Sequence, residues 1–597
     1  MKFLPHIEKT SSLSVLFGLA FVVFGWFALS LTLGSVFLFP LIAFGFVLLM
    51  TLALVIAWKF LRLSPTDLRV VFVIAALYAI SIGVVSEPTI FSGRDQGSIA
   101  EAAYRLAKNT ELAFSTPGSD SFFQIYGAGT ALNFPGFAYT SDSSLLTQFP
   151  LGYTAWLSSF VSLFDMSGFA IGNALLLFLF LFFFYQLLRL FVRPYYAFAG
   201  LALALTSFLP SWFAKLTLTE NLAVFLFTFL VYNLILFFRE GKFLFYTGIL
   251  LSGGLLAFTR IEGFAILFLA LALVIFHPHT RALIRTYPSK VLVIPGLLFF
   301  FVLLRDFFMN LPYYKMIGKA LLKTYERFGT VAGNLGESAS VSLGSIFFLY
   351  GFLLIALLGL FGVLFFLKKK QYALLIPAFI ALPTFLYLFQ PSITPDHPWM
   401  LRRYLFTLFP VLVFSAVMCL ALLFAKKEAT PLFPVKQPEG KRLFLVTLIF
   451  LGLILLQYPA WSGQLWFAEH RGLTEQIATF SQEFSDQDLI LVDRNATGDG
   501  FAMLTGPAQF LFGKNTVYFF NPYDLTALDT SRFEHVYLLT PEESQSRYAA
   551  VFGDRLVFKK SVTFTLEQYE VLSLAQNSLR LPEKQTITTR NILFQIY

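Results

Sequence analysis

The stretch Thr10–Trp58 reads TSSLSVLFGLAFVVFGWFALSLTLGSVFLFPLIAFGFVLLMTLALVIAW and contains no Asp, Glu, Lys, Arg or His. A helix crosses the hydrocarbon core of a bilayer with about 20 apolar residues, so this stretch is long enough for two spans, with a break near Gly34. The apolar core of a signal peptide has only about 7–15 residues, and no Ala-x-Ala cleavage site directly follows this stretch. The sequence therefore predicts a polytopic membrane protein.

The composition of the whole chain agrees with this interpretation. Hydrophobic residues make up 57% of the chain and charged residues 13%, with a mean hydropathy of +0.73. An ordinary soluble domain carries about 25% charged residues, so a soluble globular chain and a disordered chain are both excluded. The net charge of +9 is typical of basic cytoplasmic loops, and no basic patch with interleaved aromatic residues predicts nucleic-acid binding. The single cysteine, Cys419, permits no disulfide within the chain.

The rest of the chain repeats the opening pattern, with apolar segments separated by short polar turns. We interpret about thirteen segments as spans, which predicts a mostly α, polytopic helical bundle. The segments are 13–33, 36–58, 70–86, 168–188, 195–210, 220–238, 243–259, 262–277, 291–304, 344–367, 372–389, 404–425 and 443–459.

Basic residues between the segments test this interpretation, because cytoplasmic loops carry an excess of Lys and Arg. With the N-terminus inside, every basic loop falls on one side only if 151–166 does not cross the membrane. We therefore predict that 151–166 is a juxtamembrane helix at the outer surface and that the C-terminus lies outside. The inside residues are then Lys2, Lys9, Lys59, Arg62, Arg69, Arg189, Arg193, Arg239, Lys242, Arg281, Arg285, Lys290, Lys368, Lys369, Lys370, Lys426, Lys427, Lys436, Lys441 and Arg442.

The composition changes sharply after the last apolar segment. We divide the chain into a membrane module, 1–459, whose first outer loop is 87–167, and an extracytoplasmic domain, 460–597. The tail alternates between helical and strand-like patterns, which predicts a small α/β domain. The predicted elements are a helix at Leu473–Phe484 and strands at Leu489–Val492, Thr516–Phe520, Val536–Leu539 and Ser561–Thr565. No internal repeat of the kind that marks many transporters is visible.

Ionisable side chains gather at the outer ends of the predicted spans, where they are costly and therefore informative. Because these ends lie at one level of the bilayer, we expect a cleft that contains both carboxylates and guanidinium groups. The residues are Arg94, Asp95, Glu101, Lys215, Glu220, Arg260, Glu262, Arg305, Asp306, Asp396, His397, Arg402 and Arg403.

The segment FSGRDQGS, residues 91–98, directly follows the third span and precedes an amphipathic helical pattern, which predicts a helix in the membrane interface. Ser98 and Glu101 have the spacing of a capping box, so Glu101 is interpreted as structural. Asp95 has two interpretations that the local sequence leaves open. It is a carboxylate that stabilises the helix N-terminus, or it has a functional role in the cleft.

Two further groups stand at predicted outer helix ends. Glu220 opens a span, and Arg260 with Glu262 forms an ion pair that could hold two spans together. Arg402 and Arg403 begin a helix, where the helix dipole disfavours cations. A phosphate would remove this conflict, since guanidinium groups bind phosphate oxygens bidentately. The alternative is that both arginines extend to lipid headgroups.

The remaining motif searches give little. His397 alone is more often a surface residue than a ligand. No His, Cys and carboxylate spacing resembles a zinc site, and no phosphate-binding glycine pattern follows a strand. We therefore expect neither an obligatory metal nor a cofactor.

Taken in order, these motifs resemble the GT-C superfamily of polytopic glycosyltransferases, especially the lipid A aminoarabinose transferases and the protein O-mannosyltransferases. Residues 93–97, GRDQG, stand where the family has an acidic residue after a span, and residues 149–153, FPLGY, resemble its entry to a juxtamembrane helix. Glu220 matches the acidic residue of a later span. Arg403 with Tyr404, before Pro410, resembles the family's late Arg-Tyr helix.

The resemblance covers roughly residues 70–425 and has departures. More than one span precedes the catalytic loop, where the family usually has one, and Arg94-Asp95 replaces its Asp-Glu pair. The first loop has no Asp-x-Asp metal pair, and the tail lacks the Trp-Trp-Asp motif of oligosaccharyltransferases. These departures leave the substrate open.

The resemblance implies an inverting transfer of a sugar from a polyprenyl-phosphate donor to a lipid, glycan or protein acceptor at the outer face of a prokaryotic cell membrane. It makes Asp95 the catalytic base and Arg402 and Arg403 the groups that bind the donor phosphate. The other substrate-binding residues that it implies are Arg94, Glu220, Arg260, His397 and Tyr404. Two other classes stay open at this point: a transporter or lipid flippase, and a noncatalytic membrane scaffold.

Overall fold

The computed structural model describes residues 5–88, 90, 94–319, 343–389, 396–424, 440–500, 504–573 and 580–597 of the chain. Several features named above lie outside the described residues: Lys2, residues 91–93 of the FSGRDQGS segment, and Lys426, Lys427 and Lys436.

Apolar helices form the larger part of the molecule. Six of them are long and apolar enough to cross a membrane: α1 (Pro5–Leu33), α2 (Phe39–Leu63), α3 (Thr66–Val85), α7 (Ser167–Arg189), α10 (Thr219–Glu240) and α22 (Lys441–Gln464). Three bent pairs raise the number to nine: Val293–Met309 with Leu311–Lys319, α16 (Leu343–Leu349) with α17 (Leu353–Lys368), and Trp399–Leu405 with α21 (Leu408–Phe424). The chain is therefore an integral membrane protein with a mostly α polytopic fold, as predicted.

The prediction of about thirteen spans exceeds what helix length supports. Three of the extra segments are helices of 12, 15 and 15 residues, namely α8 (Pro194–Leu205), α11 (Phe243–Ala257) and α12 (Glu262–Phe276). The fourth is divided between α18 (Tyr372–Ile380) and α19 (Leu382–Phe389), and Pro377 lies inside α18. Hydropathy measures apolar content but does not detect where a helix bends or ends.

One bend has a clear steric cause. α16 and α17 meet at 119° beside Gly351, whose φ is +69°. A Cβ at Gly351 would lie 2.2 Å from the carbonyl oxygen of Leu456 in α22. Only glycine accepts both this backbone conformation and this close approach, so the turn can pack directly against α22.

The helices differ in how much of their apolar surface is covered by protein. In α10, 94% of the apolar window is buried, and in α7 72%, whereas the values for α2 and α22 are 22% and 28%. α10 and α7 therefore form the centre of the bundle. The outward side chains of α2 and α22 face the lipid, which is as apolar as a protein core.

The first outer loop folds into short elements at one end of the bundle. They are α4 (Asp95–Asn109), α5 (Pro117–Tyr126), β1 (Gly129–Thr130), β2 (Phe137–Tyr139), β3 (Leu145–Thr147) and α6 (Leu151–Phe164). α6 begins directly after Pro150 and has 14 residues, too few to span a bilayer, as predicted. α4 does not lie open in the interface, however: residues 96–103 are all buried, because α6 and α24 (Thr505–Phe510) of the C-terminal domain pack against it.

The C-terminal residues form the predicted small α/β domain. Its five-stranded sheet has the order β6-β5-β7-β10-β8, with β5 parallel to β6 and β7 and with β10 antiparallel to β7 and β8. The strands are β5 (Leu489–Val492), β6 (Asn515–Tyr518), β7 (Val536–Pro541), β8 (Leu556–Tyr569) and β10 (Lys584–Ile596), and the helices are α23 (Leu473–Ser481), α24 (Thr505–Phe510) and α25 (Gln545–Phe552). The prediction missed β10 and underestimated the length of β8; the first half of each strand is largely exposed.

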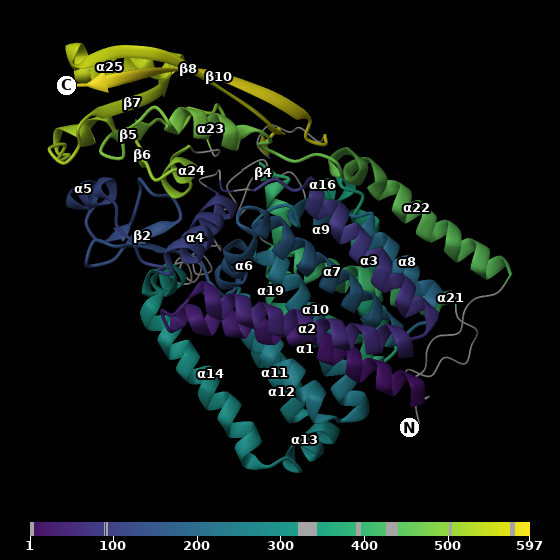
Figure 1. Cartoon of the computed structure of the whole chain (residues 1–597). Coiled ribbons are helices and arrows are strands. Elements are labelled where there is room, and N and C mark those ends of the chain that lie inside the picture. The colour runs from purple at the N-terminus through teal and green to yellow at the C-terminus, as the bar shows by residue number, and fades with distance from the viewer. Residues whose placement is uncertain are drawn as a thin grey trace, which may run out of the picture.

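Figure 1 shows this sheet above the outer-loop elements α4, α5 and β2, at the end of the bundle opposite to α13 (Pro278–Arg285) and the N-terminus. The bundle and the C-terminal domain are joined at several places. Lys215 is buried and its Nζ donates to the carbonyl oxygens of Gln464, Leu465 and Phe467, at 2.6, 2.9 and 2.8 Å. This lysine, predicted as a charge of the cleft, thus caps the C-terminal end of α22.

Candidate active site

The central interaction of the site joins residues from the first loop and the late bent helix. Asp95 is the first residue of α4, and Oδ2 of its carboxylate accepts a hydrogen bond from Nη1 of Arg402 at 2.6 Å. The Asp95 side chain is 42% exposed and that of Arg402 only 13%. The Asp95 carboxylate is thus held by a cation from another part of the chain and still has access to solvent.

The capping box predicted for Ser98 and Glu101 is wrong, because α4 begins at Asp95, three residues earlier, with Arg94 as its N-cap. The Ser98 hydroxyl donates instead to the carbonyl oxygen of Pro135 at 2.9 Å. The Glu101 carboxyl is buried against Gly506 of α24, where an added Cβ would lie 1.7 Å from Oε1. This burial raises the pKa of Glu101 well above its usual range.

Trp399 contacts two cations of the site, and this role was not predicted from the sequence. It lies in the short helix η2 (Trp399–Leu401) and is 7% exposed. The guanidinium carbon of Arg94 lies 4.7 Å from the centre of its ring, and that of Arg402 lies 5.4 Å away. Such cation–π contacts favour a tryptophan ring. A signal was present, since an aromatic residue stands just before the two arginines, but its contact with Arg94 requires the tertiary structure.

The contact with Asp95 does not use the Nε donor of Arg402. Its Nη1 binds Asp95, but its Nε is buried and makes no hydrogen bond with the described residues. A buried donor without a partner is costly, so it favours an acceptor that the protein itself does not supply. Arg94 and Arg402 also bring two positive charges together at the Trp399 ring, which suits an anionic ligand.

The C-terminal domain contributes a further carboxyl group near these cations. Burial raises the pKa of Glu469 to about 7, while Arg94 and Lys215 act in the opposite direction. Its Oε1 accepts a hydrogen bond from the backbone N–H of Tyr569 at 3.1 Å. The electrostatics of Arg94 thus depend on the tail as well as on the membrane module.

A second charged cluster lies nearby but deeper. Arg260 is bound by two carboxylates: Nη1 lies 2.6 Å from Oε1 of Glu220, and Nη2 lies 3.0 Å from Oε1 of Glu262. The Arg260 Nη1 also donates to Thr219 at 3.2 Å, and the Tyr387 hydroxyl donates to Glu262. The side chains of the three ion-paired residues are 3%, 10% and 15% exposed. The predicted Arg260–Glu262 pair is therefore confirmed, with Glu220 as an additional partner.

The remaining predicted site residues contact Tyr387 of the Arg260 cluster or Tyr350. Arg403 lies over the ring of Tyr387, at 5.6 Å, and the Tyr404 hydroxyl donates to the Tyr387 carbonyl oxygen at 3.0 Å. His397 is only 1% exposed, and its Nδ1 lies 3.1 Å from the Tyr350 hydroxyl, so the expectation of a surface histidine is wrong. The participation of these residues in substrate binding stays a prediction.

Not every outer charge joins the cleft. Nε of Arg305 donates to the carbonyl oxygen of Leu33 at 2.9 Å, and Asp306 is buried and accepts a hydrogen bond from Tyr314. These contacts hold α14 (Ser289–Met309) against its surroundings. The single cleft predicted from the sequence is thus divided into an Asp95 site, an Arg260 cluster and local structural contacts.

An apolar groove leads along the bundle toward the stretch of chain that carries Asp95. Its volume is about 900 Å³, and residues of α1, α2, α3 and α7 line it. Phe72, Ala76 and Gly83 mark its course along α3, and Ser86 and Pro88 line it at the end of that helix, shortly before Asp95 in the sequence. A groove of this lining accepts a hydrocarbon chain rather than a polar substrate.

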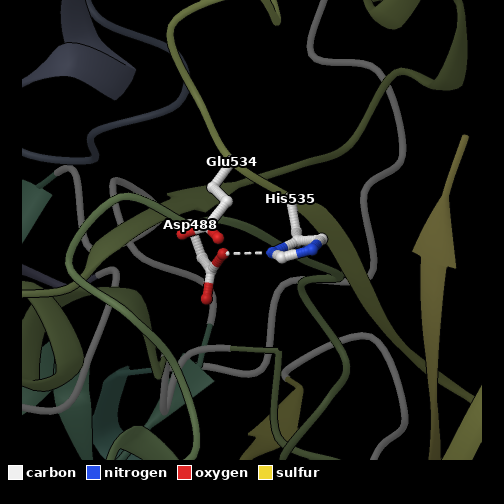
Figure 2. A group of neighbouring side chains, drawn as sticks. All are labelled: Asp488, Glu534 and His535. Carbon is white, nitrogen blue, oxygen red and sulfur yellow. Dashed lines mark hydrogen bonds and ion pairs between the residues drawn. The ribbon is translucent and has the colours of Figure 1, made fainter.

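Among the residues that the structure describes, one group has the composition of a metal site. Asp488, Glu534 and His535 each place a ligand atom within 4.8 Å of the others (Figure 2). The group lies in the C-terminal domain, and Asp488 is occupied by contacts with His535 Nδ1, at 3.1 Å, and with the backbone N–H of Ser485, at 2.8 Å. Asp95 and Arg402 are not part of it.

No protein-family model and no curated protein sequence matches the chain. Among solved structures, ArnT from Cupriavidus metallidurans bound to undecaprenyl phosphate is 11% identical, has a TM-score of 0.48 and covers 89% of this chain and 98% of its own. The apo state of the same protein is 11% identical, with a TM-score of 0.49 and coverages of 88% and 97%. Both TM-scores are below 0.5, so the proposed function rests on the side chains described above and not on this likeness.

Proposed function

We propose that the protein is a membrane glycosyltransferase that moves a sugar from a polyprenyl-phosphate donor to an acceptor at the outer face of the membrane. The observation that carries the proposal is the Asp95–Arg402 pair, in which an accessible carboxylate lies beside a guanidinium that has an unpartnered donor. A base and an anion-binding group are what transfer from a phosphate leaving group requires.

The donor phosphate is assigned to Arg402 and Arg403. The free Nε of Arg402 suits a phosphate oxygen, and a guanidinium offers the planar pair of donors that phosphate binds best. The prenyl chain is assigned to the apolar groove along α3, whose end at Ser86 and Pro88 lies on the chain leading to Asp95. The two assignments match a ligand with one apolar part and one anionic part.

Asp95 is assigned as the general base. Its carboxylate takes the proton of an acceptor hydroxyl or amine as that atom attacks the anomeric carbon. The bond from this carbon to the phosphate oxygen breaks in the same step, and the electron pair leaves with the phosphate, whose charge Arg402 stabilises. A single displacement inverts the anomeric configuration.

The direct test is a transfer assay with purified protein in lipid nanodiscs. Wild-type protein given a polyprenyl-phosphate sugar and a lipid or glycan acceptor should release polyprenyl phosphate and form the glycosylated acceptor. Movement of labelled lipid between leaflets without cleavage of the sugar–phosphate bond would instead indicate a flippase and would refute the proposal.

Sidedness has its own test. In a Cys419→Ser background, a cysteine at the exposed Tyr523 of the C-terminal domain should react with a membrane-impermeant thiol reagent in intact cells. A cysteine at Lys59, in a predicted inside loop, should react only after lysis. The reverse pattern would refute action at the outer face.

A further inference from the structure

The short segment from Asp396 to the start of α20 (Arg402–Leu405) is held by contacts with the C-terminal domain. Strand β4 (Asp396–His397) pairs with β9 (Leu572–Ser573) in an antiparallel ladder, with Asp396 opposite Ser573 and His397 opposite Leu572. Trp399 follows two residues after β4, and Arg402 three residues later. The tail is thus attached by its backbone to the segment that carries the anion-binding arginines.

The same part of the tail is anchored to the membrane module. The ring of Tyr569, just before β9, contacts the ring of Trp212 at 5.1 Å, and its hydroxyl donates to the carbonyl oxygen of Gly463 at 2.9 Å. The ammonium group of Lys215 holds the chain that leads from α22 into the domain. β9 therefore has a fixed position from which it can hold β4.

Because Trp399 lies in this attached segment, its ring limits the movement of the Arg94 and Arg402 side chains. Its ring lies 4.7 Å from the guanidinium carbon of Arg94 and 5.4 Å from that of Arg402, and it is nearly fully buried. A free arginine side chain loses much rotamer freedom when it binds a ligand, and a side chain already held in place loses less. A fixed ring that supports both guanidinium groups thus favours anion binding without touching the anion.

We infer that the C-terminal domain contributes to the anion site. Through β9 and β4 it fixes the position of Trp399, and Trp399 positions Arg402 and Arg94 for the phosphate of a polyprenyl phosphate. Trp399 is a positioning residue. The identity of the anion rests on the proposed function, whereas the coupling of the tail to the arginines rests on the contacts above.

The first test measures binding of a polyprenyl phosphate to the full-length protein in nanodiscs by isothermal titration calorimetry. Trp399→Leu should weaken binding about tenfold, and Trp399→Phe, which keeps a ring, about threefold or less. Trp466→Leu makes the same change at a tryptophan that is 67% exposed and serves as the control, with unchanged affinity expected. Equal affinities of the wild type and both Trp399 variants would overturn the inference.

The second test loosens the tail while leaving Trp399 intact. Leu572 is 2% exposed, and Leu572→Asp should displace β9 and weaken polyprenyl-phosphate binding about as much as Trp399→Leu. Val557→Asp, at a position of β8 that is 42% exposed, is the control for a new charge in the same domain. Normal binding by a folded Leu572→Asp protein would remove the role of the domain.

The third test locks the pairing. Opposite residues of an antiparallel ladder have Cα atoms about 4.5–5.5 Å apart, within the range of a disulfide. In a Cys419→Ser background, Asp396→Cys with Ser573→Cys should bind polyprenyl phosphate equally well when oxidised and when reduced. Loss of binding on oxidation, restored by reduction, would show that the strands must separate and would overturn the inference.

These outcomes separate the inference from the proposed function. Absence of polyprenyl-phosphate binding by the wild type refutes the proposed donor, whatever the variants do. Binding by the wild type with no response at Trp399 and Leu572 leaves the donor intact and refutes only the positioning role.

Discussion

Two charged clusters lie close together in this protein, and they use the same residue types in opposite ways. In the Arg260 cluster, one guanidinium is bound by Glu220 and Glu262, and Thr219 and Tyr387 complete the network. At the Asp95 site, one carboxylate binds Arg402, and the buried Nε of Arg402 has no hydrogen-bond partner among the residues that the structure describes. The exposed fraction of the carboxylate side chain is 3% for Glu220 and 42% for Asp95.

The difference separates a structural network from a site that can bind. A buried ion pair with complete partners gives little net stability, but breaking it leaves an uncompensated charge. At the Asp95 site the carboxylate side chain is 42% exposed, so the pair can exchange hydrogen-bond partners when a ligand binds. The Arg260 cluster thus has the features of a structural support, and the Asp95 site has those of a reaction centre.

Removal of the central cation of the Arg260 cluster should have the largest effect. Arg260→Met leaves two buried carboxylates without a cationic partner and should reduce stability by about 3–5 kcal/mol. Thermal unfolding in detergent measures this change. The double variant with Glu220→Gln should recover part of the loss, because one charge is then removed with its partner. A stable Arg260→Met protein that has lost only donor binding would reverse the assignment and place the substrate here.

Substitution of Asp95 should instead lower the rate of sugar transfer. Asp95→Asn keeps the shape of the side chain but cannot accept a proton, so transfer should fall by at least about 100-fold with folding and donor binding nearly intact. Asp67→Asn is the matched control, because Asp67 forms a comparable pair with Arg189 at 2.7 Å. Because Asn is also a good N-terminal helix residue, a wild-type rate in Asp95→Asn would leave Asp95 with a structural role only.

The anion-binding arginines should affect affinity more than rate. Arg402→Ala should weaken donor binding by about 1.5–3 kcal/mol, the usual loss for a charged hydrogen bond. Arg402→Lys should recover only part, because an ammonium group cannot make the planar two-bond contact. The same pair of substitutions at Arg403 shows which arginine dominates. Unchanged affinity in Arg402→Ala, Arg403→Ala and their double variant would exclude a phosphate role.

The smallest effect concerns the pH dependence that Glu469 gives to the docked tail. Its pKa rises from 4.5 to about 7 on folding, so the folded protein holds a proton that the unfolded chain releases. The contribution of this group to stability should therefore be greatest below pH 4.5 and should be lost as the pH rises through about 7. Glu469→Gln should flatten that part of the stability curve, and an unchanged pH dependence would contradict the assignment.

Much of the fold could be predicted because its signals are local. The charge-free stretch Thr10–Trp58 predicts membrane helices, and a short apolar run predicts the position of β5, Leu489–Val492. Pro150 marks the start of α6 in the same way. The number of spans could not be obtained, since bends such as the one at Gly351 depend on which backbone lies opposite.

The sequence by itself determined that this protein is a membrane protein with an α/β tail, and it singled out Asp95 and Arg402 as chemically unusual. Only the tertiary structure decided that these two residues bind each other, because 307 positions separate them and packing alone brings their helix ends together. The same holds for Trp399 under two arginines and for Glu101 against Gly506 of the tail. Apolar periodicity fixes where a helix forms, but the partners of a charge depend on contacts that the chain makes only after it has folded.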